Sequence, residues 1–252
     1  MTVHLLGTGS AQAGPTRTTT MLAVEHADRT ILVDCGADAV QRMQIAGLTP
    51  ASLDAVILTH EHPDHISGYP LLIEKLWLLG RREPIDVYGP AATLEKARAL
   101  FAVFNTERWE GLPERRFHEV PMEPGAVALA LGDLTVRAWP VDHPVPTVGL
   151  RFEAAGVTVG YSCDTAVCDA TVEIGRDADL FVHEATGSIP HVHASPKEAA
   201  ETARAANAGR LVLVHAPDGA SDDDLAAARE VFPGTRWGHD GERVEVIAAV
   251  RA

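Results

Sequence analysis

The chain has 252 residues, of which 46% are hydrophobic and 22% charged, and its formal net charge is −14 at pH 7. These values predict a single globular domain, residues 1–252, and disfavour a nonspecific nucleic-acid surface, while a local basic groove stays open. The three cysteines form no CxxC pair, and no basic leader or apolar run of about 18 residues is present. We therefore expect a cytoplasmic protein without a membrane span.

Short apolar runs between turn residues predict the first strands, over residues 3–6, 21–25, 30–33 and 55–58. A helix is expected over 39–46 and is ended by Gly47. The glycines of the loop 7–10 permit a tight turn or a close approach to a ligand. That loop is therefore either a plain turn or a wall of a binding site.

Three histidines and an aspartate follow the fourth of these runs, at His60, His62, Asp64 and His65. Pro63 disfavours helical dihedrals at His62, so we expect no helix to pass through the cluster. The cluster is not a zincin motif, because the residue four positions after His60 is an aspartate. Imidazoles and carboxylates bind zinc and related ions, and four of them exceed the three protein ligands of a mononuclear catalytic site. The cluster therefore predicts two metal ions.

This cluster after an apolar strand resembles the signature of the metallo-β-lactamase superfamily. The resemblance implies an α/β protein, an αββα four-layer sandwich with a dinuclear metal site at one sheet edge. Residues 6–10 and 33–36 also resemble the amino-terminal pattern of the ribonuclease Z branch. In that branch the aspartate that matches Asp34 supports the metal site without being a ligand.

The middle of the chain is expected to contain helices over 71–79 and 93–104, with a short strand near 85–88. Residues 106–126 are weakly patterned and are expected to be a solvated connection. Substrate contact by Arg115, Arg116 and His118 is the alternative. Further strands are expected over 134–138, 157–162, 178–182, 210–215 and 244–250.

Three single residues at strand ends complete the predicted metal site: His143, Asp164 and His215. Their surroundings resemble segments of the superfamily, and a carboxylate at position 164 can bind one ion with each oxygen. The resemblance assigns seven ligands: His60, His62 and His143 to one ion, Asp64, His65 and His215 to the other, and Asp164 as the bridge. The ions are expected to be Zn²⁺, with Mn²⁺ as the alternative.

Cys163 stands where the superfamily usually has glycine. Its side chain should alternate away from Asp164, so we expect a buried thiol rather than a further metal ligand. Near the carboxyl end, Asp222, Asp223 and Asp224 are expected to begin a helix. His239 and Asp240 are expected to form a turn outside the metal site.

Residues 183–186, His-Glu-Ala-Thr, resemble a ribonuclease Z signature. Ser195 and Glu198 have the spacing of a capping box that opens a helix over 196–206. By the resemblance, Glu184 and His193 lie near the scissile phosphate, where the pair would protonate the leaving alkoxide. The alternative is that His193 and Ser195 only cap the helix.

The predicted function is a dinuclear metal-dependent hydrolase, a phosphodiesterase that uses a metal-bound hydroxide oriented by Asp64. Only twenty residues separate His143 from Asp164, where tRNA-processing relatives carry a long arm. Residues 216–218 hold no phosphate-binding arginine. These departures favour a small phosphodiester or nucleotide derivative over nucleic acid. The alternatives are ribonuclease Z activity, hydrolysis of sulfate esters or lactones, or a sensor without turnover. A homodimer is common in the branch.

Overall fold

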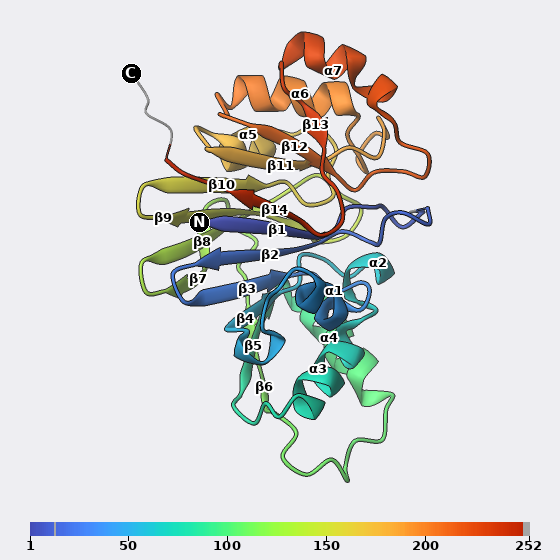
Figure 1. The fold of residues 1–252 in the computed structure, drawn as a ribbon, viewed down its shortest axis with the longest axis vertical. Helices are drawn as coiled ribbons and strands as arrows, with labels where there is room; N and C mark the ends of the chain where they lie inside the picture. Colours follow the sequence, from blue (N-terminus) through green and yellow to red (C-terminus); the bar gives the residue numbers. More distant parts are fainter. Residues whose placement is uncertain (13, 249–252) are drawn as a thin grey trace.

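The computed structural model of the chain describes residues 1–12 and 14–248 (Figure 1). Two seven-stranded sheets lie face to face. The first sheet has the order β14 (Glu242–Glu245), β1 (Thr2–Gly7), β2 (Met21–His26), β3 (Arg29–Val33), β4 (Ala55–Ile57), β5 (Ile85–Gly89) and β6 (Arg115–Glu119). The second sheet has the order β13 (Arg236–Trp237), β12 (Leu211–Val214), β11 (Leu180–Glu184), β10 (Val157–Tyr161), β9 (Val148–Ala154), β8 (Leu134–Pro140) and β7 (Ala126–Leu131).

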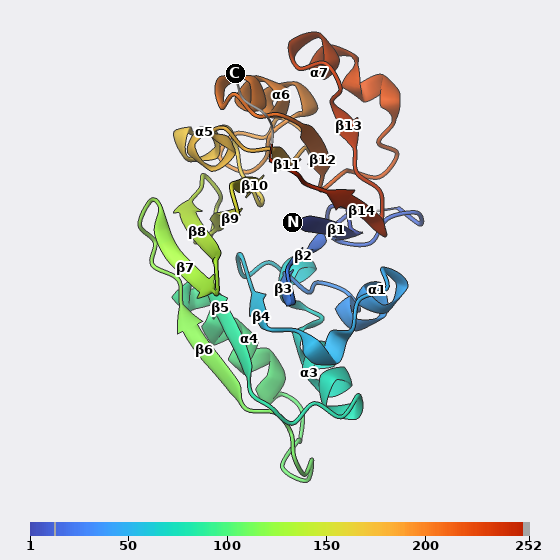
Figure 2. The same ribbon diagram turned by 60° about the vertical axis from the view of Figure 1, so that its left-hand side comes forward.

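Helices cover the outer face of each sheet, as Figure 2 shows. The first sheet is covered by α1 (Ala39–Ile45), α3 (Tyr69–Leu78) and α4 (Ala91–Ala102). The second is covered by α5 (Asp169–Gly175), α6 (Pro196–Ala205) and α7 (Ala226–Val231). Short helical turns occur at η1 (Pro50–Ser52), α2 (Pro63–Ile66) and η2 (Asp222–Leu225). The four layers confirm the predicted αββα sandwich.

The central strands are buried on both faces, which explains their continuous apolar sequences. In β4, Ile57 points into the core between the sheets, whereas Val56 packs under the helices of the first sheet. Full burial of such side chains stabilises the fold by about 1.5–3 kcal/mol each. The chain therefore leaves β4 from a rigid frame, and the histidine cluster follows immediately.

Two predictions of local structure are wrong. One is the absence of a helix from the histidine cluster, and the other is a solvated connection over residues 106–126. A short helix, α2, begins at Pro63 and contains Asp64 and His65. His62 is extended as expected, with ψ 148°, but a proline is well tolerated at the first position of a helix. The segment expected as a solvated connection contains β6, which pairs in parallel with β5. As a half-exposed edge strand, β6 lacks a clear apolar alternation.

The remaining differences concern elements that were not predicted and the length of one strand. The strands β7, β9 and β13 and the helix α5 were not predicted. The closing strand, expected over 244–250, is β14 and ends at Glu245. Positions 249 and 250 of that prediction lie outside the described residues. Within residues 1–12 and 14–248, every helix is too short or too polar to cross a lipid bilayer.

Candidate metal centre

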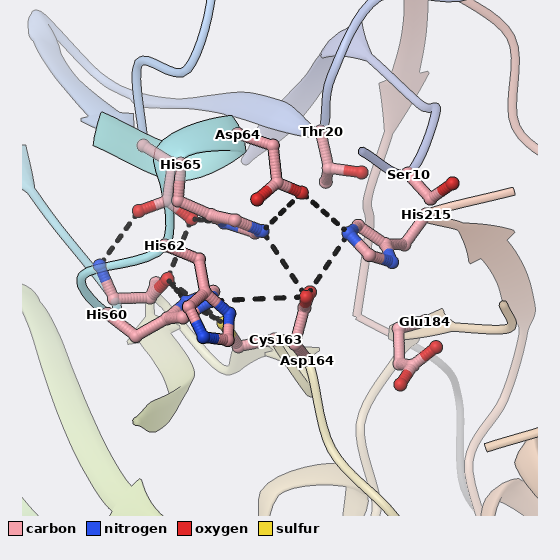
Figure 3. A network of polar contacts seen from close by, with 12 residues as sticks. Ser10, Thr20, His60, His62, Asp64, His65, Cys163, Asp164, Glu184 and His215 are labelled. Carbon is pink, nitrogen blue, oxygen red and sulfur yellow. Dashed lines mark hydrogen bonds and ion pairs between the residues drawn. The ribbon is translucent and has the colours of Figure 1, made fainter. Parts of the chain in front are cut away.

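All seven predicted ligand residues meet at one edge of the sandwich. Figure 3 labels six of them, all except His143. Four of them follow β4 of the first sheet, and the other three follow β8, β10 and β12 of the second sheet. The strands β3, β4 and β5 are parallel, as are β10, β11 and β12. Their carboxyl ends therefore gather side chains that are distant in sequence.

The first group consists of His60, His62 and His143, whose candidate ligand atoms lie within 4.8 Å of one another. Nε2 of His143 is 3.1 Å from Nδ1 of His62. Two ligand atoms on one tetrahedral zinc ion, each about 2.0–2.1 Å from the metal, lie about 3.3 Å apart. The separation between these two nitrogens fits a shared ion.

The second group consists of Asp64, His65, Asp164 and His215. Oδ2 of Asp164 lies 3.3 Å from Nε2 of His65 and 3.1 Å from Nε2 of His215. Oδ2 of Asp64 lies 3.5 and 3.3 Å from the same two nitrogens. Asp164 also faces the first group, because its Oδ2 is 3.9 Å from Nε2 of His60. Its position between the groups suits a bridging carboxylate (Figure 3).

Unpartnered buried atoms point to a cation at this place. Among the described residues, Nε2 of His60, Nε2 of His65 and Oδ1 of Asp164 are buried and make no hydrogen bond. A buried polar atom without a partner costs about 1–3 kcal/mol, so three such atoms in one cluster need a compensating ligand. Imidazole nitrogens and carboxylate oxygens are ligands that divalent metal ions prefer. The residues present therefore fit a metal centre.

Hydrogen bonds from outside the cluster hold the imidazole rings. Nδ1 of His65 is 2.8 Å from Oδ2 of Asp34, as the resemblance implied for that aspartate. Nδ1 of His143 is 2.9 Å from the carbonyl of Val192, and Nδ1 of His215 is 2.6 Å from Oγ1 of Thr186. Such outer contacts fix the tautomer and orientation of a metal ligand.

Neutral imidazoles and anionic carboxylates dominate the cluster, and His65 is the exception. Burial alone would lower the pKa of His65, but Asp164 and Asp34 raise it well above its usual value, so this imidazole would release a proton on binding a metal ion. Burial lowers the pKa of His60 and of His143, which favours the neutral, ligating imidazole. Burial alone would raise the pKa of Asp164, but His215 and His65 hold it well below its usual value. Likewise, contacts with His215 and His65 outweigh burial and lower the pKa of Asp64. Both carboxylates are therefore anionic.

The predicted catalytic pair lies beside the ligands. Nδ1 of His193 is 2.8 Å from Oε1 of the buried Glu184. Backbone N–H groups of Thr165 and Thr186 also donate to the Glu184 carboxylate, at 3.1 and 2.9 Å. The His193 ring centre is 5.4 Å from that of His215. Glu184 therefore has a fixed orientation and holds His193 next to the metal ligands.

A cavity of about 240 Å³ connects these groups. Its lining comprises Ser10, Ala11, Gln12, His62, Asp64, Asp164, Thr186, Ile189, His193 and His215. Ser10 places the loop after β1 in the wall of the site, which agrees with the binding-site interpretation of that loop. A substrate in this cavity would contact both the metal ligands and His193.

Cys163 is buried, as expected, but it lies closer to the ligands than alternation suggested. Its Sγ is 2.9 Å from Oγ1 of Thr59 and 3.7 Å from Nδ1 of His60. Cys163 has a φ of +56°, a conformation that glycine adopts without strain, so the backbone here suits the glycine that the superfamily resemblance implied. Burial raises the pKa of this thiol, so it stays protonated.

Sequence reasoning missed Thr59 as a contact of the ligands, although it directly precedes His60 at the strand end. The carbonyl of Val192 carries no side-chain signal and could not have been found. His239 and Asp240 stay outside the cluster as expected. Asp240 instead accepts hydrogen bonds from Thr8 and from the backbone N–H of Thr18, and so anchors the loop that lines the cavity.

Comparison with known proteins finds matches over most of the chain. The family "Beta-lactamase superfamily domain" matches residues 29–216. A ribonuclease Z from Mycobacterium sp. (strain KMS) is 34% identical over 280 aligned positions, covering 98% of this chain and 97% of the relative. The structure of YhfI, a metallo-beta-lactamase fold protein from Bacillus subtilis, matches with a TM-score of 0.81 and 26% identity, covering 96% of this chain and 98% of YhfI.

The short form of human tRNase Z has the same fold, with a TM-score of 0.80 and 22% identity, and the match covers 98% of this chain and all of the human protein. The family match spans more than half of the chain, and the mycobacterial relative exceeds 30% identity over nearly all of it. The chain therefore belongs to the beta-lactamase superfamily, as a metallo-β-lactamase-fold hydrolase of its ribonuclease Z-like branch.

Proposed function

We propose that this hydrolase cleaves phosphodiester bonds with the help of two divalent metal ions, and that RNA is its first candidate substrate. The observation that carries the proposal is the convergence of seven candidate metal ligands beside the Glu184–His193 pair. Four of these ligands and His193 line one cavity. We place RNA before the small phosphodiester that the sequence favoured as a substrate. The reason is that a relative with 34% identity over nearly the whole chain is a ribonuclease.

The seven candidate ligands would be divided between two metal ions. His60, His62 and His143 would hold one ion, Asp64, His65 and His215 the other, and Asp164 would contact both. When bound, two such ions activate water and neutralise charge on the phosphoryl group. The ligand set of imidazoles and carboxylates suits Zn²⁺, with Mn²⁺ as the alternative that metal analysis of the purified protein would distinguish.

Proton transfer to the leaving oxygen is assigned to His193. The Nδ1–H of His193 donates to Glu184, which leaves Nε2–H free to protonate the departing alkoxide. Glu184 stabilises the imidazolium and fixes the ring plane. Asp64 lines the cavity, and its carboxylate would accept a hydrogen bond from the attacking water and orient it toward phosphorus.

A small phosphodiester is the second candidate substrate. The alignment with the mycobacterial ribonuclease spans 280 positions, whereas this chain has 252 residues, so the relative contains residues without a counterpart here. The connection of twenty residues between His143 and Asp164 leaves no room for a long RNA-binding arm. This observation favours a substrate that fits the cavity of about 240 Å³. The cytoplasmic location and a homodimer stay predictions.

The test compares a precursor tRNA with bis(p-nitrophenyl) phosphate, using metal-loaded wild type, Asp64→Ala and His193→Ala. We expect Asp64→Ala to abolish both reactions. We expect His193→Ala to lower RNA cleavage by about 10²–10⁴-fold. Its effect on the nitrophenyl diester should be smaller, because nitrophenolate leaves without a proton. His239→Ala removes an exposed histidine outside the site and is the matched control.

Each outcome decides between the candidates. Cleavage of the nitrophenyl diester without cleavage of RNA would support the small phosphodiester. Failure on both, with two metals bound, would contradict phosphodiester hydrolysis. Sulfate esters and lactones would then be assayed, and inactivity on these as well would leave a metal-dependent sensor as the function.

A further inference from the structure

The hydroxyl of Thr59 is linked by hydrogen bonds to both groups of candidate metal ligands, directly to the first and through Asp34 to the second. Thr59 is fully buried and follows β4. Its Oγ1 lies 2.7 Å from Oδ2 of Asp34, 3.2 Å from Nδ1 of His60 and 2.9 Å from Sγ of Cys163. Nδ1 of His65 contacts the same Asp34 oxygen at 2.8 Å. One hydroxyl therefore touches a ligand of the first group and the support of a ligand of the second.

The number of hydrogens on each group determines which atom donates in each of these hydrogen bonds. A threonine hydroxyl has one hydrogen and two lone pairs, and an ionised carboxylate only accepts hydrogen bonds. The Thr59 hydrogen must therefore go to Asp34. The two lone pairs of Thr59 then accept from Nδ1–H of His60 and from the S–H of Cys163. The single donor and both acceptor positions of the Thr59 hydroxyl are then occupied.

We propose that Thr59 is a positioning residue that fixes the tautomer of His60 directly and that of His65 through Asp34, with Cys163 completing its hydrogen bonds. In both histidines the proton is then on Nδ1, so Nε2 presents its lone pair to the cluster. These Nε2 atoms are the two buried imidazole nitrogens of the cluster that have no hydrogen-bond partner. Because His60 belongs to one group and His65 to the other, a single hydroxyl orients both.

The inference rests on the proposed dinuclear site but not on any substrate. The alternative to a positioning role is that Thr59 only provides hydrogen bonds to buried polar atoms at a strand end. The backbone N–H of Thr59 already donates to Oδ1 of Asp34 at 2.8 Å, and Thr59→Val would keep that bond. The valine variant therefore removes the hydroxyl while leaving the backbone contact and nearly the same volume.

The test is the zinc affinity of the metal-free, full-length protein, measured by competition with a chromogenic chelator. We expect Thr59→Val to weaken binding of both ions by about 10–100-fold, as loss of a ligand's supporting contact does elsewhere. Thr59→Ser, which restores the hydroxyl, should stay within about threefold of wild type. Thr235→Val is the matched control, because the Thr235 hydroxyl is also buried but donates only to the carbonyl of Phe232.

A spectroscopic measurement reports the tautomer itself. In the zinc-loaded wild type, long-range ¹H–¹⁵N spectra should show a slowly exchanging Nδ1–H on His60 and on His65. The His60 signal should be lost or fast-exchanging in Thr59→Val and retained in Thr59→Ser. A proton on Nε2 of His60 in the wild type would overturn the assignment without any variant.

The remaining outcomes are equally decisive. Wild-type zinc affinity in Thr59→Val, or a loss no greater than in Thr235→Val, would overturn the inference. If Thr59→Val does not fold, Cys163→Gly and Cys163→Ser replace it, because glycine suits the φ of +56° and serine keeps a donor. Glycine should weaken zinc binding several-fold and serine should not, and equal affinities would contradict the role of Cys163. Absence of zinc binding in the wild type would instead contradict the proposed metal centre.

Discussion

The carboxylate of Glu184 sets the protonation of His193, and this gives a pH dependence. Burial lowers the pKa of His193, but the hydrogen bond and charge of Glu184 outweigh burial and raise it above its usual value. The imidazolium is therefore present below this raised pKa and is lost as the pH rises through it. Since the imidazolium is the proposed acid, activity should fall on the alkaline side.

Glu184→Gln should move that alkaline limb to lower pH, because glutamine keeps a hydrogen-bond acceptor but removes the negative charge. The measurement is kcat against pH for a substrate with a poor leaving group. Glu201→Gln, on the exposed part of α6, provides the control for a change of charge alone. An unmoved limb in the Glu184 variant would show that His193 is not the group that titrates.

At the scale of single residues, the clustering of the proposed ligands was predictable, but the contacts that support their rings were not. His60, His62, Asp64 and His65 form a dense cluster after a strand, and a carboxylate at a strand end is visible in any sequence. The support of His143 is a backbone carbonyl, that of Val192, and only the fold brings it within 2.9 Å. Likewise, Nδ1 of His62 faces His143, whereas His60 and His65 present Nε2, and this depends on ring rotation that no spacing encodes.

At the scale of elements, the N-terminus of α6 anchors the loop that carries His193. Oγ of Ser195 accepts from the backbone N–H of Glu198, and the Glu198 carboxylate accepts from the backbone N–H of Ser195, which completes the predicted capping box. The Glu198 carboxylate also accepts from Oγ of Ser188 at 2.9 Å. The cap therefore joins the helix to both sides of the loop that carries His193.

Ser195→Ala should lower the free energy of unfolding by about 1 kcal/mol, the typical cost of losing an N-cap. In a domain of this size that corresponds to a Tm about 2–4 °C lower. Thermal unfolding followed by circular dichroism would measure it, with Ser195→Thr as the variant that keeps an oxygen for the cap. An alanine variant as stable as wild type would mean that α6 is held by packing alone.

Elements with a strong local signal were predicted and those without one were missed. The helix α6 has a cap, a proline at its first position and an apolar stripe. The strand β6 has none of these signals, because it is an edge strand whose stability comes from pairing with β5 and from cation–π contacts of Arg98 with Phe117 and of Arg115 with Phe101. Such support is tertiary and leaves little periodicity in the sequence.

At the scale of the whole molecule, the proposed metal centre would join the two sheets. The cluster from His60 to His65 belongs to the first sheet, whereas His143, Asp164 and His215 follow strands of the second. The sequence shows these residues as separate strand ends, and their convergence depends on how the two sheets face each other (Figure 2). Bound ions would therefore act as cross-links between the two halves of the sandwich.

Metal removal should consequently destabilise the whole domain rather than the loops alone. At free zinc about 100 times Kd, each ion contributes about 2.7 kcal/mol to the folded state. In a domain of this size 1 kcal/mol shifts Tm by about 2–4 °C, so chelation of both ions should lower Tm by about 10–20 °C. Calorimetry before and after dialysis against a chelator would measure it. The Asp164→Asn variant is the control, because it lacks the carboxylate that faces both groups and should respond much less. An equal Tm for the zinc-loaded and chelated wild type would mean that interactions within the sandwich hold the sheets together without the ions.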